Sequence, residues 1–457
     1  MLAQSLVNDL WRDAGLGAAP EQPPLIGHDP VMASSFHVGA AAQASIAAAA
    51  FAACEIGIAR GGARRSATVD MRHALNECSA YFKVDGREPE RWDALSGLYA
   101  AGDGWVRVHA NFAHHRAIAL RVLRLPAEAT REEAAAALAE RGALEYEDEV
   151  ARAGGVAAAV RSFAEWDAHP HAAPLAALPL IAWERQGDAP ARRLKPLPDG
   201  ARPLAGLRVL DLTRILAGPV AGRTLAAYGA EVMLVNSPNL PNIESIVETS
   251  RGKLSCHVDL ATPVGRAALA NLIRGADIFI QGYRPGALAA LGFSAEEVTR
   301  INPGIVCVSL SAYGHTGPWK ARRGFDSLVQ TALGFNHAEA QAAHASQPRA
   351  LPVQILDYAS GFLMAFAAQA ALLRQVREGG AWHVRIALAR TALWLRGMGR
   401  VADGLQAGVP ASEDCLQISQ SGWGELVAMR HAAKIQGLPD PWDRPSVRPG
   451  THPPAWT

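Results

Sequence analysis

The sequence has few cysteines, and none of them is spaced as a metal-binding or redox pair. The five are scattered along the chain, at Cys54, Cys78, Cys256, Cys307 and Cys415. Without a CxxC, neither a zinc site nor a disulfide framework is predicted, and this usage is typical of a reducing compartment. The first residues, MLAQSLVNDLWRDAG, lack the basic-then-apolar pattern of a signal peptide. We therefore expect a cytoplasmic protein without a bound metal.

An excess of charge of either sign is also lacking. The chain has 44 Lys and Arg against 43 Asp and Glu, a net charge of +1, so no nucleic acid is expected as a partner. Hydrophobic residues make up 49% of the sequence and charged residues 19%, which is typical of a globular protein. The length of 457 residues predicts two or three domains.

Several motifs of common enzyme classes are missing. No HExxH, GxGxxG or GxxxxGK[ST] stands at a predicted strand–helix junction, which leaves zinc protease, dinucleotide-dependent dehydrogenase and P-loop functions unsupported. His114 and His115 are adjacent in the sequence, so they do not share a face of a helix or strand and form a poor metal pair.

One long hydrophobic run approaches the length of a membrane span, at Val38–Ala59. It consists mostly of alanine and is interrupted by Gln43 and Glu55. The composition favours a helix buried in protein, so no membrane association is expected.

What the sequence does contain is a regular alternation of strands and helices from Leu204 onward. Apolar strand candidates stand at 207–212, 231–236, 254–260, 277–281 and 304–311, with helical segments between them. A long apolar helix then begins near Asp357 and stops at Gly379-Gly380, and a strand, WHVRIAL, follows. This order predicts an α/β fold with a Rossmann-like, mostly parallel sheet covered on both faces.

The region from His37 has a similar order of elements. When Gly61-Gly62 is placed on Gly379-Gly380, an Ala-rich helix, a strand and a second helix follow one another in both segments. We interpret this as an internal duplication in which Gly39 pairs with Asp357. Two Ala-rich helices that end at glycines by chance are the alternative.

Three regions are expected. Residues 1–200 contain the first long helix and a smaller α/β unit, residues 204–400 form the Rossmann-like domain, and residues 401–457 are polar, rich in proline, and predicted to be an extended tail. The segment 186–202, rich in Pro, Gly, Arg and Asp, reads as a linker.

The second region resembles the family III (CaiB/BaiF-type) coenzyme A transferases. The resemblance rests on pieces that occur in the family's order: PLAGLRVLDLTRILAGP, GAEVMLVNSP, RGKLSCHVDL, GYRPGALAALGF, INPGIVCVSLSAYGHTGPW, GFDSLVQTALG and ILDYASGFLMA. The first 200 residues are similar to the later half of the family, so the chain looks like a truncated tandem copy with its halves in reverse order. The resemblance implies an interlocked homodimer that acts on an acyl-CoA and a carboxylic acid acceptor.

The resemblance also implies that Asp357 is the nucleophile, through an aspartyl acyl-anhydride and an aspartyl-CoA thioester. From the residues alone, Asp357 begins a long helix, where free N–H groups and the dipole favour a negative charge. A helix N-cap is the alternative role for this residue.

Coenzyme A carries phosphates and an adenine, and the resemblance places its contacts on loops that follow the strands. The candidates are Arg214, Ala217, Lys253, Tyr283, Arg284 and Tyr313. For the charged residues the alternative is a solvated surface position, and Tyr313 could equally be a packed residue at a strand end. The sequence departs from the family's pattern in three ways. Asn236 stands where the family often has an acidic residue, and Leu254 where a basic residue is frequent. A Gly-rich mobile loop is also lacking.

Three rival functions remain open. An acyl-CoA racemase needs an acid–base pair, and its histidine would stand where this chain has Phe325. An intramolecular CoA isomerase would use the same aspartate. A catalytically inactive acyl-CoA-binding subunit is the third.

Overall fold

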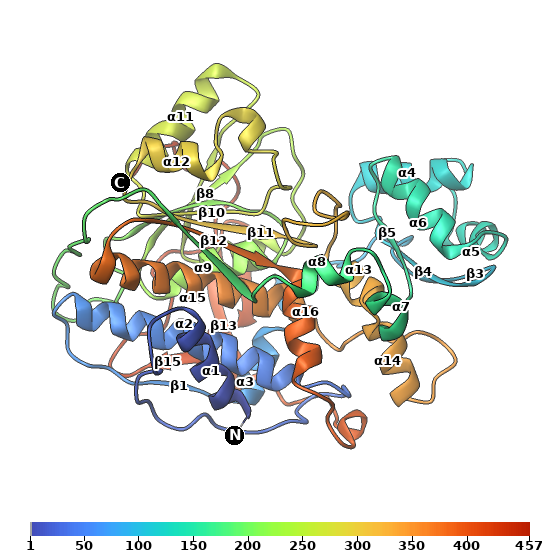
Figure 1. The fold of residues 1–457 in the computed structure, drawn as a ribbon, viewed down its shortest axis with the longest axis horizontal. Helices are drawn as coiled ribbons and strands as arrows, with labels where there is room; N and C mark the ends of the chain where they lie inside the picture. The colour runs from blue at the N-terminus through green and yellow to red at the C-terminus, as the bar shows by residue number, and fades with distance from the viewer. Residues whose placement is uncertain (1) are drawn as a thin grey trace.

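The computed structural model describes residues 2–457, and its centre is a seven-stranded sheet (Figure 1). The strands lie in the order β6-β12-β11-β10-β7-β8-β9. Every neighbouring pair is parallel except β6 with β12. Their bounds are β6 Ile181–Gln186, β7 Arg208–Leu212, β8 Glu231–Asn236, β9 Lys253–His257, β10 Ile278–Gln281, β11 Val306–Ser311 and β12 Ala381–Ala387. The predicted Rossmann-like, mostly parallel sheet is confirmed.

Helices cover both faces of this sheet. Successive strand residues point to opposite faces, so Val209 and Ile278 join one core while Leu210 and Phe279 join another. The first core is closed by α9 (Ala217–Ala227) and α15 (Ile355–Glu378), and the second by α11 (Pro263–Arg274) and α12 (Ala295–Ile301).

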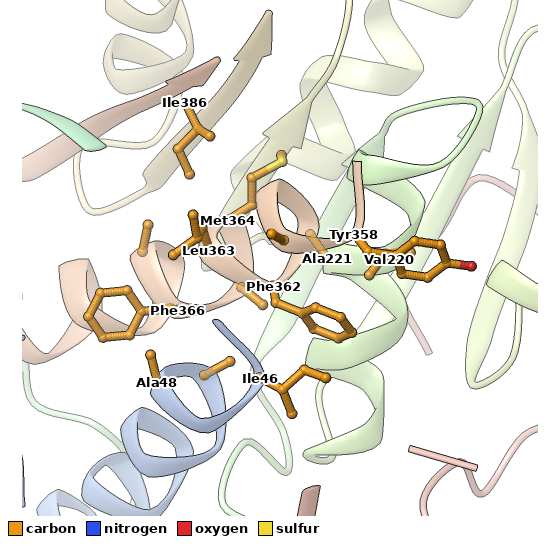
Figure 2. Packing of buried hydrophobic residues seen from close by; sticks show 14 of the residues in the cluster. Ile46, Ala48, Val220, Ala221, Tyr358, Phe362, Leu363, Met364, Phe366 and Ile386 are labelled. Carbon is orange, nitrogen blue, oxygen red and sulfur yellow. The ribbon is translucent and has the colours of Figure 1, made fainter. Parts of the chain in front are cut away.

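A second layer lies outside α15, where α2 (Val38–Ala59) packs along it. In Figure 2, Ile46 and Ala48 of α2 lie beside Phe362 and Phe366 of α15. Both helices are long and apolar enough to cross a membrane, but 89% of the apolar window of α2 and 100% of that of α15 are buried within the protein. The prediction that Val38–Ala59 is a buried helix is confirmed.

The burial of these helices bears on the expected homodimer. A chain with its halves in reverse order would need a dimer partner if its long helices could not cover one another. Instead, α2 and α15 cover one another inside one chain, and the Gln369 side chain donates to the carbonyl of Ala49 (3.1 Å). This particular reason for a dimer is wrong, and the dimer itself stays a prediction.

The predicted internal duplication agrees with the structure only in the order of helices and strands along the chain. After α2 come β1 (Ala67–Val69) and α3 (Met71–Glu77), as β12 and α16 (Leu388–Gly397) follow α15. However, β1 pairs antiparallel with β15 (Ala433–Ile435), whereas β12 lies parallel to β11 in the large sheet. The two helix–strand segments therefore differ in topology, and the match between the glycine pairs does not identify equivalent units.

A smaller domain, at the right of Figure 1, has its own core. It contains the antiparallel sheet β3-β4-β5 and three helices. Their bounds are β3 Gly97–Ala101, β4 Gly104–Val108, α4 Ala113–Leu123, α5 Arg131–Ala139, α6 Ala143–Arg152 and β5 Ala157–Ala159. The chain returns from it through α7 (Phe163–Asp167) and α8 (Ala172–Ala176) to β6.

The carboxyl-terminal region departs from the predicted extended tail. The hairpin of β13 (Leu416–Ser421) and β14 (Gly424–Met429) pairs with β2 (Phe82–Val84), far away in the sequence. The final residues do run over the surface, and the indole of Trp456 donates to the carbonyl of Leu272 (2.9 Å). The region thus links the first 200 residues to the sheet domain.

Candidate active site

Asp357 lies in the first turn of α15, where that helix meets α9 and α16. The hydroxyl groups of Ser360 and Thr391 lie 2.7 Å apart. Gly361 faces the beginning of α9 so closely that an added Cβ would stand 2.4 Å from the carbonyl oxygen of Ala217. Ala217 therefore brings backbone next to the aspartate's helical turn, and only glycine fits opposite it.

The structure does not support an N-cap role for Asp357. Gln354 occupies the N-cap position, and Asp357 is the third residue of the helix. Its side chain is only 8% exposed. Burial, and then the negative charge of Asp326, raise its pKa well above the usual value, and no hydrogen bond is among the causes. The carboxyl group is therefore poorly solvated, and it does not cap the helix by accepting a backbone N–H.

Asp326, which sequence reasoning assigned to a separate motif, is the partner of Asp357. It is the first residue of α13 (Asp326–Ala332) and is completely buried. Its carboxylate accepts the backbone N–H of Asp357 (3.0 Å) and the side-chain amide of Gln330. Burial raises the pKa of Asp326 to about 6, although these hydrogen bonds oppose the change. Two neighbouring buried carboxyl groups are a common arrangement at catalytic sites.

The loop between β7 and α9, which leads into the helix that packs against α15, contains a residue in a strained conformation. Ile215 has a φ of +77°, which is rare for a β-branched residue and is found where a fold constrains a functional loop. Asp211 anchors the loop by accepting the N–H (3.0 Å) and the hydroxyl (2.5 Å) of Thr213.

Lys253 is held inside the protein. Its ammonium group is completely buried and donates to Asp211 (2.8 Å) and to the carbonyl of Pro219 (2.8 Å). Burial lowers its pKa, and the Asp211 charge opposes that shift. The expectation that Lys253 meets a phosphate does not fit this position, because the residue stabilises the strand–helix junction from inside.

Lys253→Met is therefore expected to affect stability and not coenzyme binding. Removing one member of a buried ion pair leaves an uncompensated charge, so the free energy of unfolding should fall by about 3 kcal/mol. Chemical denaturation measures this loss, and titration with coenzyme A should give an unchanged Kd for the folded fraction. A weakened Kd with unchanged stability would restore the phosphate role.

Arg214 and Tyr283 meet at the carboxyl edge of the sheet, while Arg284 remains exposed next to them. Arg214 is half-buried, donates to the carbonyl of Pro241, and lies 5.7 Å from the ring of Phe112. Burial lowers its pKa. The structure thus brings two of the predicted coenzyme contacts together.

Tyr313 lies in a packed aromatic cluster. It is 2% exposed, and its ring is 5.0 Å from Trp319 and 6.3 Å from His171. His171 also bonds to the Tyr313 carbonyl through Nε2 (2.7 Å). This position fits the alternative of a packed residue at the end of a strand.

A cavity of about 230 Å³ opens at the carboxyl ends of β10, β11 and β12, on the face covered by α12. Parallel sheets bind ligands at this edge. Its lining includes Tyr283, Arg284, Ser311, His383 and Arg385. Basic side chains at such an edge suit an anionic ligand. His383 and Arg385 were not predicted as site residues, because both stand inside a strand.

Residues 204–414 match the family model of CoA-transferase family III. A probable fatty acyl-CoA transferase, Rv3272, of Mycobacterium tuberculosis is 34% identical over 215 residues, which cover 44% of this chain and 54% of the relative. A succinate–glutarate CoA-transferase of Agrobacterium fabrum is 34% identical over 211 residues, covering 42% and 52%.

Solved structures are similar over the same part. The crystal structure of Rv3272 shares 34% identity with a TM-score of 0.40, over 43% of this chain and 58% of that one. A CaiB/BaiF family protein from Brucella suis shares 28% identity with a TM-score of 0.38, over 49% and 65%. The chain spans about half the length of the curated relatives it matches.

Proposed function

We propose that this protein is a cytoplasmic acyl-CoA:carboxylate CoA-transferase in which Asp357 carries the transferred groups. The observation that supports this most directly is the position of Asp357. Its carboxyl group is buried at the beginning of α15 beside Asp326, has no capping role, and lies in the segment that matches the family model of CoA-transferase family III.

The proposed reaction needs one carboxylate and no external oxidant or reductant. The Asp357 carboxylate attacks the thioester carbonyl and expels the thiolate of coenzyme A, which forms a mixed anhydride. The thiolate then attacks the aspartyl carbonyl, releases the donor acid and forms an aspartyl thioester. The acceptor carboxylate attacks that thioester, and return of the thiolate yields the new acyl-CoA and free Asp357.

The surrounding residues would have distinct tasks. Burial removes water from Asp357, which strengthens a carboxylate nucleophile once it is ionised. Arg214, Tyr283 and Arg284, at the carboxyl edge of the sheet, are suited to the phosphates and adenine of coenzyme A. Backbone at Ala217 would lie beside the reacting groups.

The properties of His109, the histidine next to Phe325, weaken the racemase alternative. The ring of His109 is stacked on Phe325, with their centroids 4.1 Å apart. Burial lowers the pKa of His109 to about 3, with smaller contributions from His115 and Arg107. A neutral imidazole that accepts a proton so weakly is poorly suited to act as the second acid–base group near neutral pH.

A trapping experiment tests the transferase directly. Incubation with an acyl-CoA in the absence of an acceptor should leave coenzyme A covalently attached to Asp357, and peptide mapping by mass spectrometry should locate it. Addition of a carboxylic acid should discharge the adduct and yield its CoA ester. Turnover without an adduct, or an adduct on another residue, would contradict the mechanism.

The same experiment separates the other two rivals. With a ¹³C-labelled acceptor acid, a transferase places the label in the acyl-CoA product, whereas an intramolecular isomerase produces unlabelled ester. An inactive binding subunit would retain acyl-CoA in equilibrium dialysis without forming any adduct.

A further inference from the structure

We propose that a cavity at the carboxyl-terminal end of α9 binds a small phosphate-type anion, at a site separate from Asp357. The cavity has a volume of about 180 Å³ and lies where α9 meets α3, β15 and the segment that follows β15. The inference goes beyond the proposed function, because it assigns a second ligand site that takes no part in CoA transfer.

The cavity lies at the opposite end of α9 from the proposed active site. Ala227, the last residue of α9, lines the cavity, whereas Ala217, the first residue, faces Gly361 in the helical turn of Asp357. A helix of this length separates its ends by roughly 15 Å. The volume is also below the range of about 300–1,000 Å³ that is usual for drug-sized ligands. A small ion therefore suits this cavity better than coenzyme A.

Basic side chains dominate the charged part of the lining. They are Arg202, Arg430 and Lys434, and the acidic side chain among the lining residues is Asp440. Arg202 is paired with Asp443. Arg430 donates to a backbone carbonyl, and Lys434 is exposed on β15. Neither Arg430 nor Lys434 forms an ion pair with an acidic side chain within residues 2–457, so the cavity keeps a positive charge.

Two hydrogen-bond donors in this lining lack an acceptor. The Nε atoms of Arg202 and Arg430 are buried and have no hydrogen-bond partner in the part of the chain that the structure describes. Arg202 as a whole is 7% exposed. Buried donors are rarely left unpaired in proteins, and guanidinium groups match the geometry of phosphate oxygens. An anion in the cavity would supply the missing acceptors.

Two histidines hold the wall of the cavity in place. The Nε2 atom of His73 lies 3.1 Å from the carbonyl of Arg430. His431 lies between Glu77 (3.1 Å) and the hydroxyl of Tyr228 (3.0 Å). Burial lowers the pKa of His73, although the charge of Glu77 opposes this, so the His73 ring is neutral near pH 7. These contacts fix the backbone that carries Arg430, and a site formed in advance costs less to order when its ligand binds.

Solvation of a basic surface by water is the competing explanation. In that case oxyanions would bind weakly, without saturation and without dependence on particular side chains. A defined site predicts saturable binding that depends on Arg430 and Lys434 and not on cations elsewhere in the protein.

The test is isothermal titration calorimetry with inorganic phosphate, in the presence of saturating coenzyme A so that phosphate cannot enter the coenzyme site. The wild-type protein should bind one phosphate per chain. Arg430→Met should raise the Kd by about 10- to 100-fold, the effect of losing a hydrogen bond between charged groups. Acetate, which carries a single charge, should bind more weakly than phosphate, and equal binding of the two would overturn the assignment of a phosphate-type ligand.

Lys434→Met keeps the inference testable if Arg430→Met does not fold, because Lys434 is exposed. It should raise the Kd for phosphate by about 10-fold. Arg121→Met is the matched control, since Arg121 is exposed on α4 of the small domain, and it should leave the Kd unchanged. A wild-type protein without saturable binding, an unchanged Kd in Lys434→Met, or an equal loss in Arg121→Met would overturn the inference. The measurement needs no turnover, so its result is independent of whether CoA transfer is observed.

Discussion

Asp357→Asn is expected to lower the rate of CoA transfer by about 10⁴-fold or more, because both covalent intermediates form on this carboxylate. Asparagine nearly keeps the shape of the side chain but has no nucleophilic oxygen of comparable strength. The measurement is turnover of an acyl-CoA with an acceptor acid. Asp357→Ala should be equally inactive.

The same substitution should not destabilise the protein. A carboxyl group whose pKa is raised in the folded state makes folding less favourable once the pH exceeds its ordinary unfolded value. The pKa of Asp357 is raised by burial and by Asp326. At neutral pH the uncharged asparagine therefore removes the free-energy cost of a buried carboxylate in the folded state. Thermal melts of Asp357→Asn should lie at or above those of the wild-type protein.

Asp326→Asn tests whether Asp326, in addition to Asp357, is needed for the reaction. It removes the charge that raises the pKa of Asp357 but keeps an oxygen that can accept the Asp357 N–H. We expect this variant to retain measurable transfer. Wild-type turnover by Asp357→Asn, after mass spectrometry has excluded deamidation to aspartate, would refute the proposed mechanism.

The central sheet could be predicted from the sequence because its signals are local. Each apolar run is bounded by turn residues and followed by a helix, and this alternation leaves few topologies other than a parallel sheet. The start of a long apolar helix also drew attention to Asp357, but its role as the nucleophile was implied only by the resemblance to the family III coenzyme A transferases.

The features that were missed depend on contacts between distant segments. Lys253 follows Arg251 and Gly252, a polar context typical of a surface turn, and only its contact with Asp211 shows that it is buried. Asp326 is separated from Asp357 by 31 residues. The hairpin at 416–429 pairs with β2, which lies more than 300 positions earlier in the sequence. Nothing in the sequence of the hairpin itself indicates that pairing.

A buried ionic network joins three parts of the chain, and Glu77 lies at its centre. Glu77 of α3 contacts Arg223 of α9 (2.8 Å), the Nδ1 of His431 (3.1 Å) and the N–H of Ala432 (2.8 Å). Glu77 and Arg223 are both completely shielded from solvent. These contacts connect the amino-terminal region, the sheet domain and the carboxyl-terminal region.

Glu77→Gln is expected to lower the free energy of unfolding by about 5 kcal/mol, the upper part of the range for breaking a buried ion pair. The amide cannot offset the charge of Arg223, and it replaces one accepting oxygen with a donor beside the Ala432 N–H. Denaturation in guanidinium chloride measures the change. Glu90→Gln, at an exposed position, is the matched control and should alter stability by less than about 0.5 kcal/mol.

The difference between wild-type protein and Glu77→Gln should depend on pH in a defined direction. Burial by itself raises the pKa of Glu77, but His431, Arg223 and the Ala432 N–H outweigh it and lower the pKa from 4.5 to about 2. A carboxylate with a lowered folded-state pKa stabilises the protein above its unfolded value and loses that contribution as the pH falls through the folded one. The stability difference should therefore be full above about pH 4.5 and shrink between pH 4.5 and 2. A difference that stays constant over this range would show that Glu77 acts by packing and not by its charge.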